Sequence, residues 1–290
     1  MEAFIKPLIV IVGQTASGKS DLAVDLAVKF NGEIICVDSR TIYKGMDIGT
    51  SKPDLDLQKK VPHHLLDIVH PDEEFTAADM KIRANQSIKN IEMTGKVPFL
   101  VGGTGLYINS IIYDFKFGAR KDKKTRQKLE SLTDAQLASQ AKNMGIRQKD
   151  VNFLNRRHLI RAIERGGMIK DASKLRQDCI VIGIEIDSNI LKTRISERID
   201  QMIDLGLEDE AKNLAEKYGF DVPGMNAIGY KEWKAYFEGE QSIDDVRQSM
   251  YKNTWQYARR QKTWFKRDKN INWITSVDEA VRLVEQFLIQ

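Results

Sequence analysis

Cysteines are scarce in this sequence, and it contains no long hydrophobic run. The 290 residues include only Cys36 and Cys179, each within a short apolar stretch. Such a chain lacks the cysteines of a disulfide framework and fits a reducing compartment, so we expect a cytoplasmic protein. No apolar run approaches the about 20 residues needed to span a bilayer, and no small-residue cleavage site follows the apolar N-terminal stretch. We therefore expect neither export nor membrane insertion.

Internal repeats and low-complexity linkers are also missing. Hydrophobic residues make up 42% of the chain and charged residues 30%, which is ordinary for a folded globular protein. The length is sufficient for one large core or for two domains.

The charge is distributed unevenly along the chain. The net charge is +4, but residues 116–176 contain 17 basic and 6 acidic residues and so carry about +11. The rest of the chain is therefore acidic, at about −7. Concentrated lysine and arginine favour a polyanionic partner larger than a nucleotide, because neutralising phosphates is their usual role. The alternative is a solvated helical surface.

Residues 13–20 read GQTASGKS and fit the phosphate-loop pattern G-x-x-x-x-G-K-[ST]. An apolar run at 8–12 precedes them, and apolar residues at helical spacing follow. In such a loop the backbone N–H groups and the helix N-terminus bind phosphates, while Lys19 adds a positive charge and the Ser20 hydroxyl can ligate Mg²⁺. The expected ligands of a diphosphate or triphosphate are Gly13, Thr15, Ala16, Ser17, Gly18, Lys19 and Ser20.

Short apolar runs alternate with helical patterns along the chain. We expect strands at 8–12, 33–37, 97–101, 180–186 and 271–274. This alternation predicts an α/β fold with a parallel sheet flanked by helices. Together with the phosphate loop, it predicts a P-loop NTPase-like core.

The basic segment between the third and fourth predicted strands carries helical patterns only. We expect an inserted all-helical domain at 117–176 and a core made of 1–116 and 177–290. A further helical run at 190–265 follows, and part of it is expected to pack with the insert.

Polar residues follow the second and third predicted strands. Ligand groups collect at the carboxyl ends of parallel strands, so Asp38 and the run Gly102-Gly103-Thr104-Gly105 should face the phosphate loop. Asp38 could bind magnesium, act as a general base or cap the following turn. Thr104 could bond to a phosphate or substrate, or cap the helix that begins near Leu106.

Two further patterns have competing interpretations. His63 and His64 lack the spacing and the partner ligands of a zinc site, so we expect a structural or hydrogen-bonding role. Residues 255–267 interleave aromatic and basic side chains, as nucleic-acid surfaces do. An amphipathic helix with core aromatics and solvated bases explains that pattern equally well.

Six segments together resemble the tRNA dimethylallyltransferases, also called tRNA isopentenyltransferases. These segments are residues 13–20, 38–53, 62–67, 102–107, 227–230 and 258–265, and the resemblance covers nearly the whole chain. It implies transfer of a dimethylallyl group from dimethylallyl diphosphate to the N6 amine of the adenosine just 3′ of a tRNA anticodon. The phosphate loop would hold the diphosphate, with Mg²⁺ at Ser20. Asp38 would take the amine proton, and Thr104 would contact the reacting region.

The resemblance implies further ligands and a role for the basic insert. Arg194 and Arg198 are expected to contact the diphosphate, and ion pairing on a helix surface is the alternative. The insert would grip the tRNA anticodon stem-loop, and we expect the protein to act as a monomer. The expected tRNA contacts are Asp38, Ser39, Arg40, Thr41, Thr104, Arg126, Arg157, Arg161, Arg259 and Arg260.

The chain departs from the family pattern at two places. Gln14 stands where family members usually have proline, which we expect the loop to tolerate. Thr41 stands where many members have glutamine, and Arg40 precedes it. We expect the second departure to alter contacts to the tRNA base more than the type of reaction.

Three other functions share part of these features. A nucleotide-kinase-like phosphotransferase would use the loop and the sheet but would not need the basic insert. An isopentenyltransferase acting on free adenine nucleotides would need neither the insert nor Arg259 and Arg260. The third is an RNA-binding phosphate-loop protein without catalytic activity, from which an enzyme would differ by losing turnover in Asp38→Asn while keeping its tRNA affinity.

Overall fold

The computed structural model describes most of the chain as two compact units. The described residues are 7–117, 123–148, 151–164 and 174–289. The larger unit comprises Met1–Tyr113 with Leu175–Gln290, and the smaller unit comprises Asp114–Lys174. Within the described residues, no helix is both long and apolar enough to cross a membrane.

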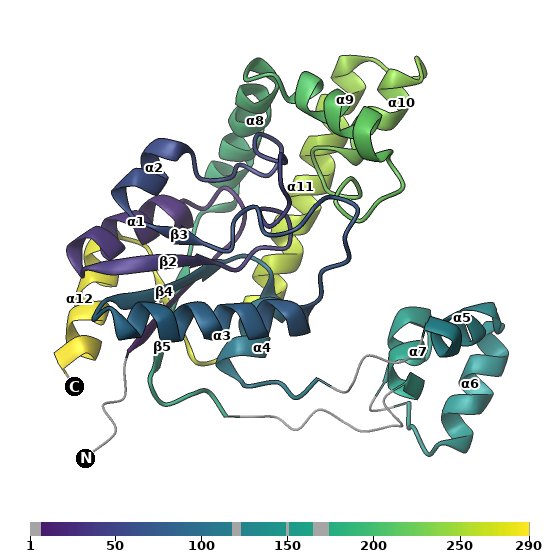
Figure 1. Ribbon diagram of the computed structural model, residues 1–290, viewed down its shortest axis with the longest axis horizontal. Coiled ribbons are helices and arrows are strands. Elements are labelled where there is room, and N and C mark those ends of the chain that lie inside the picture. Colours follow the sequence, from purple (N-terminus) through teal and green to yellow (C-terminus); the bar gives the residue numbers. More distant parts are fainter. Residues whose placement is uncertain (1–6, 118–122, 149–150, 165–173, 290) are drawn as a thin grey trace. The chain divides into compact units, whose positions relative to one another are not determined.

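In its described part, the larger unit is built on a six-stranded parallel sheet with the order β3-β2-β4-β1-β5-β6 (Figure 1). The strands are β1 (Leu8–Val12), β2 (Gly32–Cys36), β3 (His63–His64), β4 (Val97–Gly102), β5 (Cys179–Ile184) and β6 (Ile271–Ile274). The five predicted strands are confirmed with small shifts, the largest being β5, which ends at Ile184 rather than at 186. The sequence did not reveal β3, because two residues are too few to show a periodicity.

The central strand β1 is buried along its whole length, and all five of its side chains are fully shielded from solvent. It lies between β4 and β5, as expected for a continuous apolar run in a parallel sheet covered on both faces. The phosphate loop follows this strand directly. The P-loop NTPase-like fold predicted from the sequence is therefore confirmed.

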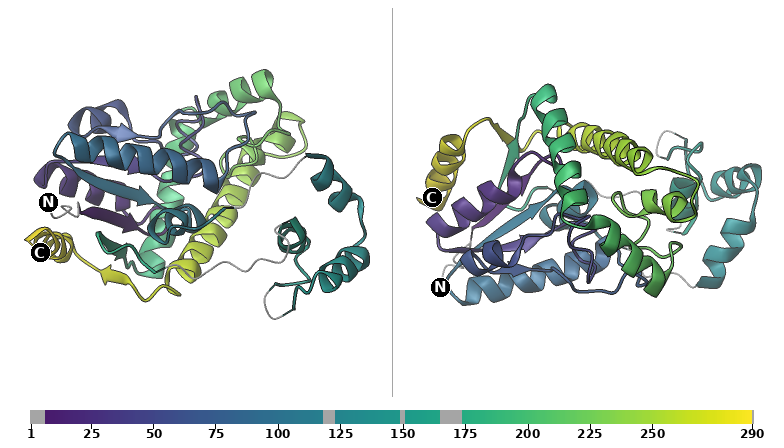
Figure 2. Two further views of the ribbon diagram at one scale, coloured as in Figure 1. Left: turned by 60° about the horizontal axis from the view of Figure 1, so that its bottom comes forward. Right: turned by 90° about the horizontal axis from the view of Figure 1, so that it is seen from above.

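Helices cover both faces of the sheet. Ile9 and Ile11 share one hydrophobic cluster with residues of α1 and α12, and Figure 2 shows α3 on the opposite face. A capping box formed by Thr76 and Asp79 begins α3. The helices of this unit are α1 (Lys19–Lys29), α2 (Leu55–Lys60), α3 (Ala77–Met93), α4 (Gly105–Ile112), α8 (Ser188–Asp204), α9 (Leu207–Tyr218), the 3₁₀ helix η1 (Lys231–Trp233), α10 (Lys234–Phe237), α11 (Ile243–Phe265) and α12 (Val277–Ile289).

The smaller unit contains three helices in its described part, namely α5 (Lys123–Ser131), α6 (Asp134–Asn143) and α7 (Arg156–Glu164). A second capping box, formed by Thr133 and Gln136, begins α6. The helices enclose a separate apolar core. Its buried members are Leu129, Leu137, Ala141, Ile146, Leu159, Ile160 and Ile163.

Candidate functional site

The phosphate loop connects β1 to α1 through two residues in the left-handed region. Ala16 has a φ of 59° and Gly18 a φ of 89°, a conformation that is rare for residues with a Cβ. Gly18 is the N-cap of α1, and no side chain caps this helix. The first amides of α1 therefore lie at the positive end of the helix dipole without a side-chain acceptor, which is where proteins bind anions.

Two loop serines have different environments. The Ser17 hydroxyl is buried and has no hydrogen-bond partner in the described part of the chain. A Cβ at Gly13 would lie 2.8 Å from that hydroxyl oxygen, so the close approach of Ser17 requires a glycine there. Ser20, in the first turn of α1, is exposed. Of the two hydroxyl groups, only that of Ser20 is open to solvent.

Three cations reach the loop. Lys19 Nζ donates to the Gln14 carbonyl oxygen at 3.3 Å. From α8, Arg198 Nη1 donates to the Thr15 hydroxyl oxygen at 3.3 Å, and Arg194 Nη1 lies 3.5 Å from a loop carbonyl oxygen. Among the residues that the structure describes, no carboxylate forms an ion pair with any of these cations. Positive charge therefore gathers at the loop, and in the described part of the chain no carboxylate is in direct contact with it.

The surroundings of the loop favour a bound anion. Burial, followed by the nearby charge of Arg198, lowers the pKa of Lys19 to about 8, while Asp38 opposes the shift. Burial also lowers the pKa of Arg198, and again Asp38 opposes the change. Two partly desolvated cations that repel each other gain stability when a bound anion neutralises them.

Helix α11 is hydrogen-bonded directly to the phosphate loop. The Gln261 side chain accepts from the backbone N–H of Thr15 at 2.8 Å and donates to the Gly103 carbonyl oxygen at 3.0 Å. Gln14, the residue found where the family usually has proline, donates through its side chain to the Ala258 carbonyl oxygen at 2.9 Å. The Thr15 N–H is thus bonded to a side chain of the protein and differs from the loop amides that are expected to bind phosphate. The Thr15 hydroxyl, in contrast, contacts Arg198.

The glycines after β4 allow α11 to approach. A Cβ at Gly103 would lie 2.2 Å from Gln261 Nε2, and a Cβ at Gly105 would lie 2.2 Å from Cδ1 of Trp264. Neither distance is sterically possible. Gly103 and Gly105 therefore serve close packing against α11.

Asp38 follows β2 and is anchored through one carboxylate oxygen. Its Oδ1 accepts from the backbone N–H of Arg40 at 2.8 Å, which caps the turn. Within the described residues the other oxygen accepts no hydrogen bond. The charge of Asp38 opposes the lowering of the Lys19 pKa and helps to raise the pKa of Tyr257, so this carboxylate lies near both the loop lysine and Tyr257 of α11. Capping the turn and acting as a base are therefore compatible, because they use different oxygens.

Thr104 does not cap α4 with its side chain, although it occupies the N-cap position. Its hydroxyl oxygen accepts from the backbone N–H of Ser39 at 3.2 Å, and the hydroxyl donates to Ser39 Oγ at 3.4 Å. The structure thus excludes helix capping as the role of this hydroxyl. The contact ties the end of β4 to the segment after β2, beside Asp38.

Tyr257 of α11 is a site residue that the sequence reasoning missed. It lies beside Thr104 and Gln261, and burial together with Asp38 raises its pKa to about 12. The spacing of four residues between Tyr257 and Gln261 places both on one face of a helix, a signal that was available in the sequence.

Arg40 and Thr41, two predicted tRNA contacts, are partly engaged within the protein. Arg40 Nη1 donates to the Pro223 carbonyl oxygen at 3.2 Å. The Thr41 backbone carbonyl accepts from the Asp67 N–H at 3.3 Å. The Thr41 hydroxyl is buried and lacks a hydrogen-bond partner among the described residues.

In the smaller unit, the predicted RNA contacts have different surroundings. Arg126 pairs with Glu130 at 2.8 Å and with Glu164 at 2.9 Å, which joins α5 to α7. Arg157 and Arg161 on α7 are both exposed. Arg126 therefore has a structural role in this unit, whether or not it contacts RNA.

The aromatic and basic stretch 255–267 has the burial pattern of the expected amphipathic helix, and its use as a nucleic-acid surface stays a prediction. Phe265 is buried, as a core aromatic would be, whereas Trp264 is 40% exposed. Arg259 and Arg260 are exposed on α11, and the Arg260 guanidinium lies 5.8 Å from the centre of the Tyr257 ring. One face of the helix packs on the core and the other presents bases to solvent.

The adjacent histidines have the structural role that was expected. His64 Nε2 lies 2.6 Å from a Glu33 carboxylate oxygen, and His63 Nδ1 lies 2.7 Å from the Val61 carbonyl oxygen. Lys96 pairs with the other oxygen of Glu33. Across the described ranges, no group of three or more His, Cys, Asp or Glu residues could hold a metal ion.

Known proteins are similar to this chain in sequence and in fold. Residues 41–268 match the family described as IPP transferase. A tRNA dimethylallyltransferase from Staphylococcus haemolyticus is 40% identical over 295 residues, covering 96% of this chain and 89% of the relative. The solved structure of the full-length tRNA isopentenylpyrophosphate transferase from Bacillus halodurans is 36% identical with a TM-score of 0.75, covering 98% of this chain and 96% of that one. A eukaryotic dimethylallyltransferase acting on tRNA is 26% identical with a TM-score of 0.83, covering 98% of this chain and 78% of that one.

Proposed function

The chain belongs to the IPP transferase family, and from this membership we propose that it transfers a dimethylallyl group from dimethylallyl diphosphate to tRNA. The acceptor is the N6 amine of the adenosine immediately 3′ of the anticodon, and the products are isopentenyl-adenosine and diphosphate. One observation carries the assignment of the site. Lys19 and Arg198 lie together at the phosphate loop without a carboxylate partner in the described chain, and Asp38 is close by.

The cations stabilise the leaving group. As the amine nitrogen attacks the allylic carbon, the C–O bond breaks and its electron pair passes to the diphosphate. Lys19, Arg194, Arg198 and the free amides of α1 face the charge that develops there. Donors fixed in place before the reaction stabilise such charge strongly, because they need not reorganise.

Asp38 removes the proton that the amine loses. Its anchored oxygen fixes the carboxylate in the turn after β2, which leaves the second oxygen for the amine. The adenine amine is a weak nucleophile because its lone pair is delocalised, so positioning it in line with the allylic carbon provides much of the rate. Thr104 and Tyr257 lie beside Asp38 and form the wall against which the reacting base is placed.

Magnesium fits this site as a cofactor. The exposed Ser20 hydroxyl is the one side-chain ligand that we assign, and diphosphate oxygens and water would complete the shell. Mg²⁺ commonly binds in this way, keeping several waters and using few protein groups beside substrate phosphates. Bound there, it would neutralise part of the diphosphate charge.

The tRNA is held through basic side chains outside the phosphate loop. In the smaller unit we assign this role to Arg157 and Arg161, which are exposed on α7, with Arg126 supporting that helix. On α11 we assign it to Arg259 and Arg260. The adenosine must leave its stack to reach Asp38, as bases do in other enzymes that modify them. The anticodon stem-loop as the bound region, the monomeric state and the cytoplasmic location stay predictions.

The test is an assay with defined substrates. The protein, Mg²⁺ and dimethylallyl diphosphate are incubated with unmodified tRNA that carries adenosine 3′ of its anticodon, and the tRNA is digested and analysed by mass spectrometry. We expect isopentenyl-adenosine at that position, and no product when ATP replaces the prenyl donor. Comparable transfer to free AMP would favour an enzyme of free nucleotides, and ATP hydrolysis without prenyl transfer would favour a phosphotransferase.

A further inference from the structure

Arg198 is held from two sides by hydroxyl groups. Its Nη1 lies 3.3 Å from the Thr15 hydroxyl in the phosphate loop, and its Nε donates to the Ser51 hydroxyl at 2.6 Å. The contact to Ser51 is the shorter of the two, and its length is that of a charge-assisted hydrogen bond. In the described chain, Nη2 donates no hydrogen bond to protein. The two contacts therefore fix the plane of the guanidinium and leave one nitrogen for a ligand.

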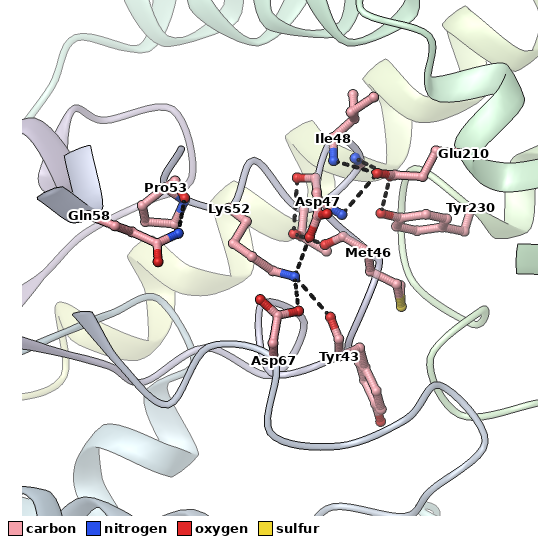
Figure 3. Close-up of polar contacts among 12 residues, drawn as sticks. Tyr43, Met46, Asp47, Ile48, Lys52, Pro53, Gln58, Asp67, Glu210 and Tyr230 are labelled. Atoms are coloured by element: carbon pink, nitrogen blue, oxygen red, sulfur yellow. Dashed lines mark hydrogen bonds and ion pairs between the residues drawn. The ribbon is translucent and has the colours of Figure 1, made fainter. Parts of the chain in front are cut away.

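The backbone around Ser51 is itself fixed. Ser51 has a φ of 49°, and its N–H donates to the Ile48 carbonyl oxygen at 2.9 Å. Lys52, whose side chain is only 4% exposed, pairs with Asp47 and Asp67 and donates to the Tyr43 carbonyl oxygen at 3.0 Å (Figure 3). These contacts hold the turn in which Ser51 lies.

Helix α9 fixes the same loop from another direction. One carboxylate, that of Glu210, accepts from the backbone N–H groups of Asp47, Ile48 and Gly49 at 3.0, 2.9 and 3.1 Å. It also accepts from the Tyr230 hydroxyl at 2.7 Å (Figure 3). The loop that carries Ser51 is thus held by charged side chains at both ends, and its hydroxyl has a defined position.

We propose that Ser51 is a positioning residue for the diphosphate site, where it holds the Arg198 guanidinium against the phosphate loop in readiness for the ligand. Arginine side chains lose considerable rotamer entropy when they are ordered. Because the bond to Ser51 orders Arg198 before the substrate binds, less entropy is lost on binding. The inference rests on the proposed function, because it takes the ligand to be a diphosphate. Ser51 touches no reacting atom and acts only through Arg198.

Binding of inorganic pyrophosphate to the full-length protein with Mg²⁺, followed by calorimetry, tests this role without the transfer reaction. We expect S51A to weaken pyrophosphate binding by about three- to tenfold, the usual net contribution of one hydrogen bond, because Ser51 acts on the ligand only through Arg198. The KM for dimethylallyl diphosphate should rise to the same extent, while the KM for tRNA should not change. Ser51→Gly should behave like S51A, because glycine accepts the left-handed backbone and likewise lacks the hydroxyl.

A double-mutant cycle identifies the route of the effect. In an R198A background, S51A should cause no further loss, because the group on which it acts is gone. Thr50→Val is the matched control, since the Thr50 hydroxyl donates to the Met46 carbonyl oxygen at 2.6 Å and makes no contact with Arg198. This variant should keep wild-type pyrophosphate affinity.

The outcomes separate the inference from the proposed function. Wild-type affinity in both Ser51 variants would overturn the positioning role and leave the function intact. An equal loss in the R198A background, or a matching rise in the KM for tRNA, would also overturn it by showing a general effect of the loop. A wild-type protein that binds no pyrophosphate would instead contradict the proposed function.

Discussion

The Gln261 side chain on α11 accepts a hydrogen bond from the backbone N–H of Thr15 in the phosphate loop, at 2.8 Å. The two residues are 246 positions apart in the sequence. The Nε2 atom of Gln261 also donates a hydrogen bond to the Gly103 carbonyl oxygen. One buried amide thus joins the phosphate loop, the end of β4 and the helix that presents Arg259 and Arg260.

Replacing this amide should destabilise the protein. Gln261→Leu leaves a backbone N–H and a backbone carbonyl without partners in a buried place, and we expect a loss of about 1–3 kcal/mol in the free energy of unfolding. Urea unfolding followed by circular dichroism measures it. Gln256→Leu, at an exposed position of the same helix, is the control and should change stability little. Equal stability of the two variants would contradict the role assigned to Gln261.

Removing the charge of Asp38 should abolish transfer while leaving tRNA binding intact. Asp38→Asn keeps an oxygen that can accept from the Arg40 N–H, so the turn is preserved, but the amide takes up no proton. We expect kcat to fall by about two to four orders of magnitude, the usual contribution of a general base. Single-turnover assays and filter binding with the same tRNA separate the two effects. Asp25→Asn, on the exposed side of α1, should retain full activity, and substantial turnover in Asp38→Asn would rule out this carboxylate as the base.

Pyrophosphate affinity should fall as the pH rises through about 8. Burial and Arg198 hold the pKa of Lys19 at about 8 in the free protein, and a bound anion raises it, so binding at higher pH requires uptake of a proton. Between about pH 8 and 10.5, the ordinary pKa of lysine, Lys19 binds more protons in the unfolded chain than in the folded one. The free energy of unfolding of the ligand-free protein should therefore rise with pH in this range. Calorimetry in buffers of different ionisation enthalpy measures the uptake. The Lys19→Arg variant keeps its charge at each pH, so its pyrophosphate binding should lack the proton uptake that belongs to Lys19. Ionisation of pyrophosphate itself affects both proteins equally. Identical pH profiles of the two proteins would contradict the assignment.

In the smaller unit, Arg157 should contribute to tRNA binding and Arg126 to the packing of the helices. Arg157→Gln should weaken tRNA binding and reduce the slope of log affinity against log salt by about 1, as the loss of one phosphate contact does. An unchanged slope would mean that Arg157 is solvated surface.

Arg126→Gln should act mainly on structure. It breaks the pairs with Glu130 and Glu164 that join α5 to α7, so amide hydrogen exchange in 156–164 should quicken. If exchange there is unchanged while the salt slope falls, Arg126 is an RNA contact and not a structural one.

Patterns in the sequence were sufficient to predict the α/β class, five of the strands, the phosphate loop and the resemblance to the tRNA dimethylallyltransferases. These features depend on local periodicity or on motifs that span a few residues. Such patterns can be recognised in the sequence before the packing is known. The two-residue strand β3 gave no such signal.

Which side chains meet at the loop depends on how the distant elements pack together. The Arg198 guanidinium reaches the loop across 183 positions of sequence, Gln261 occupies the Thr15 amide, and the Thr104 hydroxyl bonds to Ser39 rather than capping its helix. Nothing local distinguishes Arg126, paired with two carboxylates, from Arg157, exposed on α7. Hydrogen bonds act over about 3 Å, so the partner of a polar side chain is fixed by the packing that brings distant elements together.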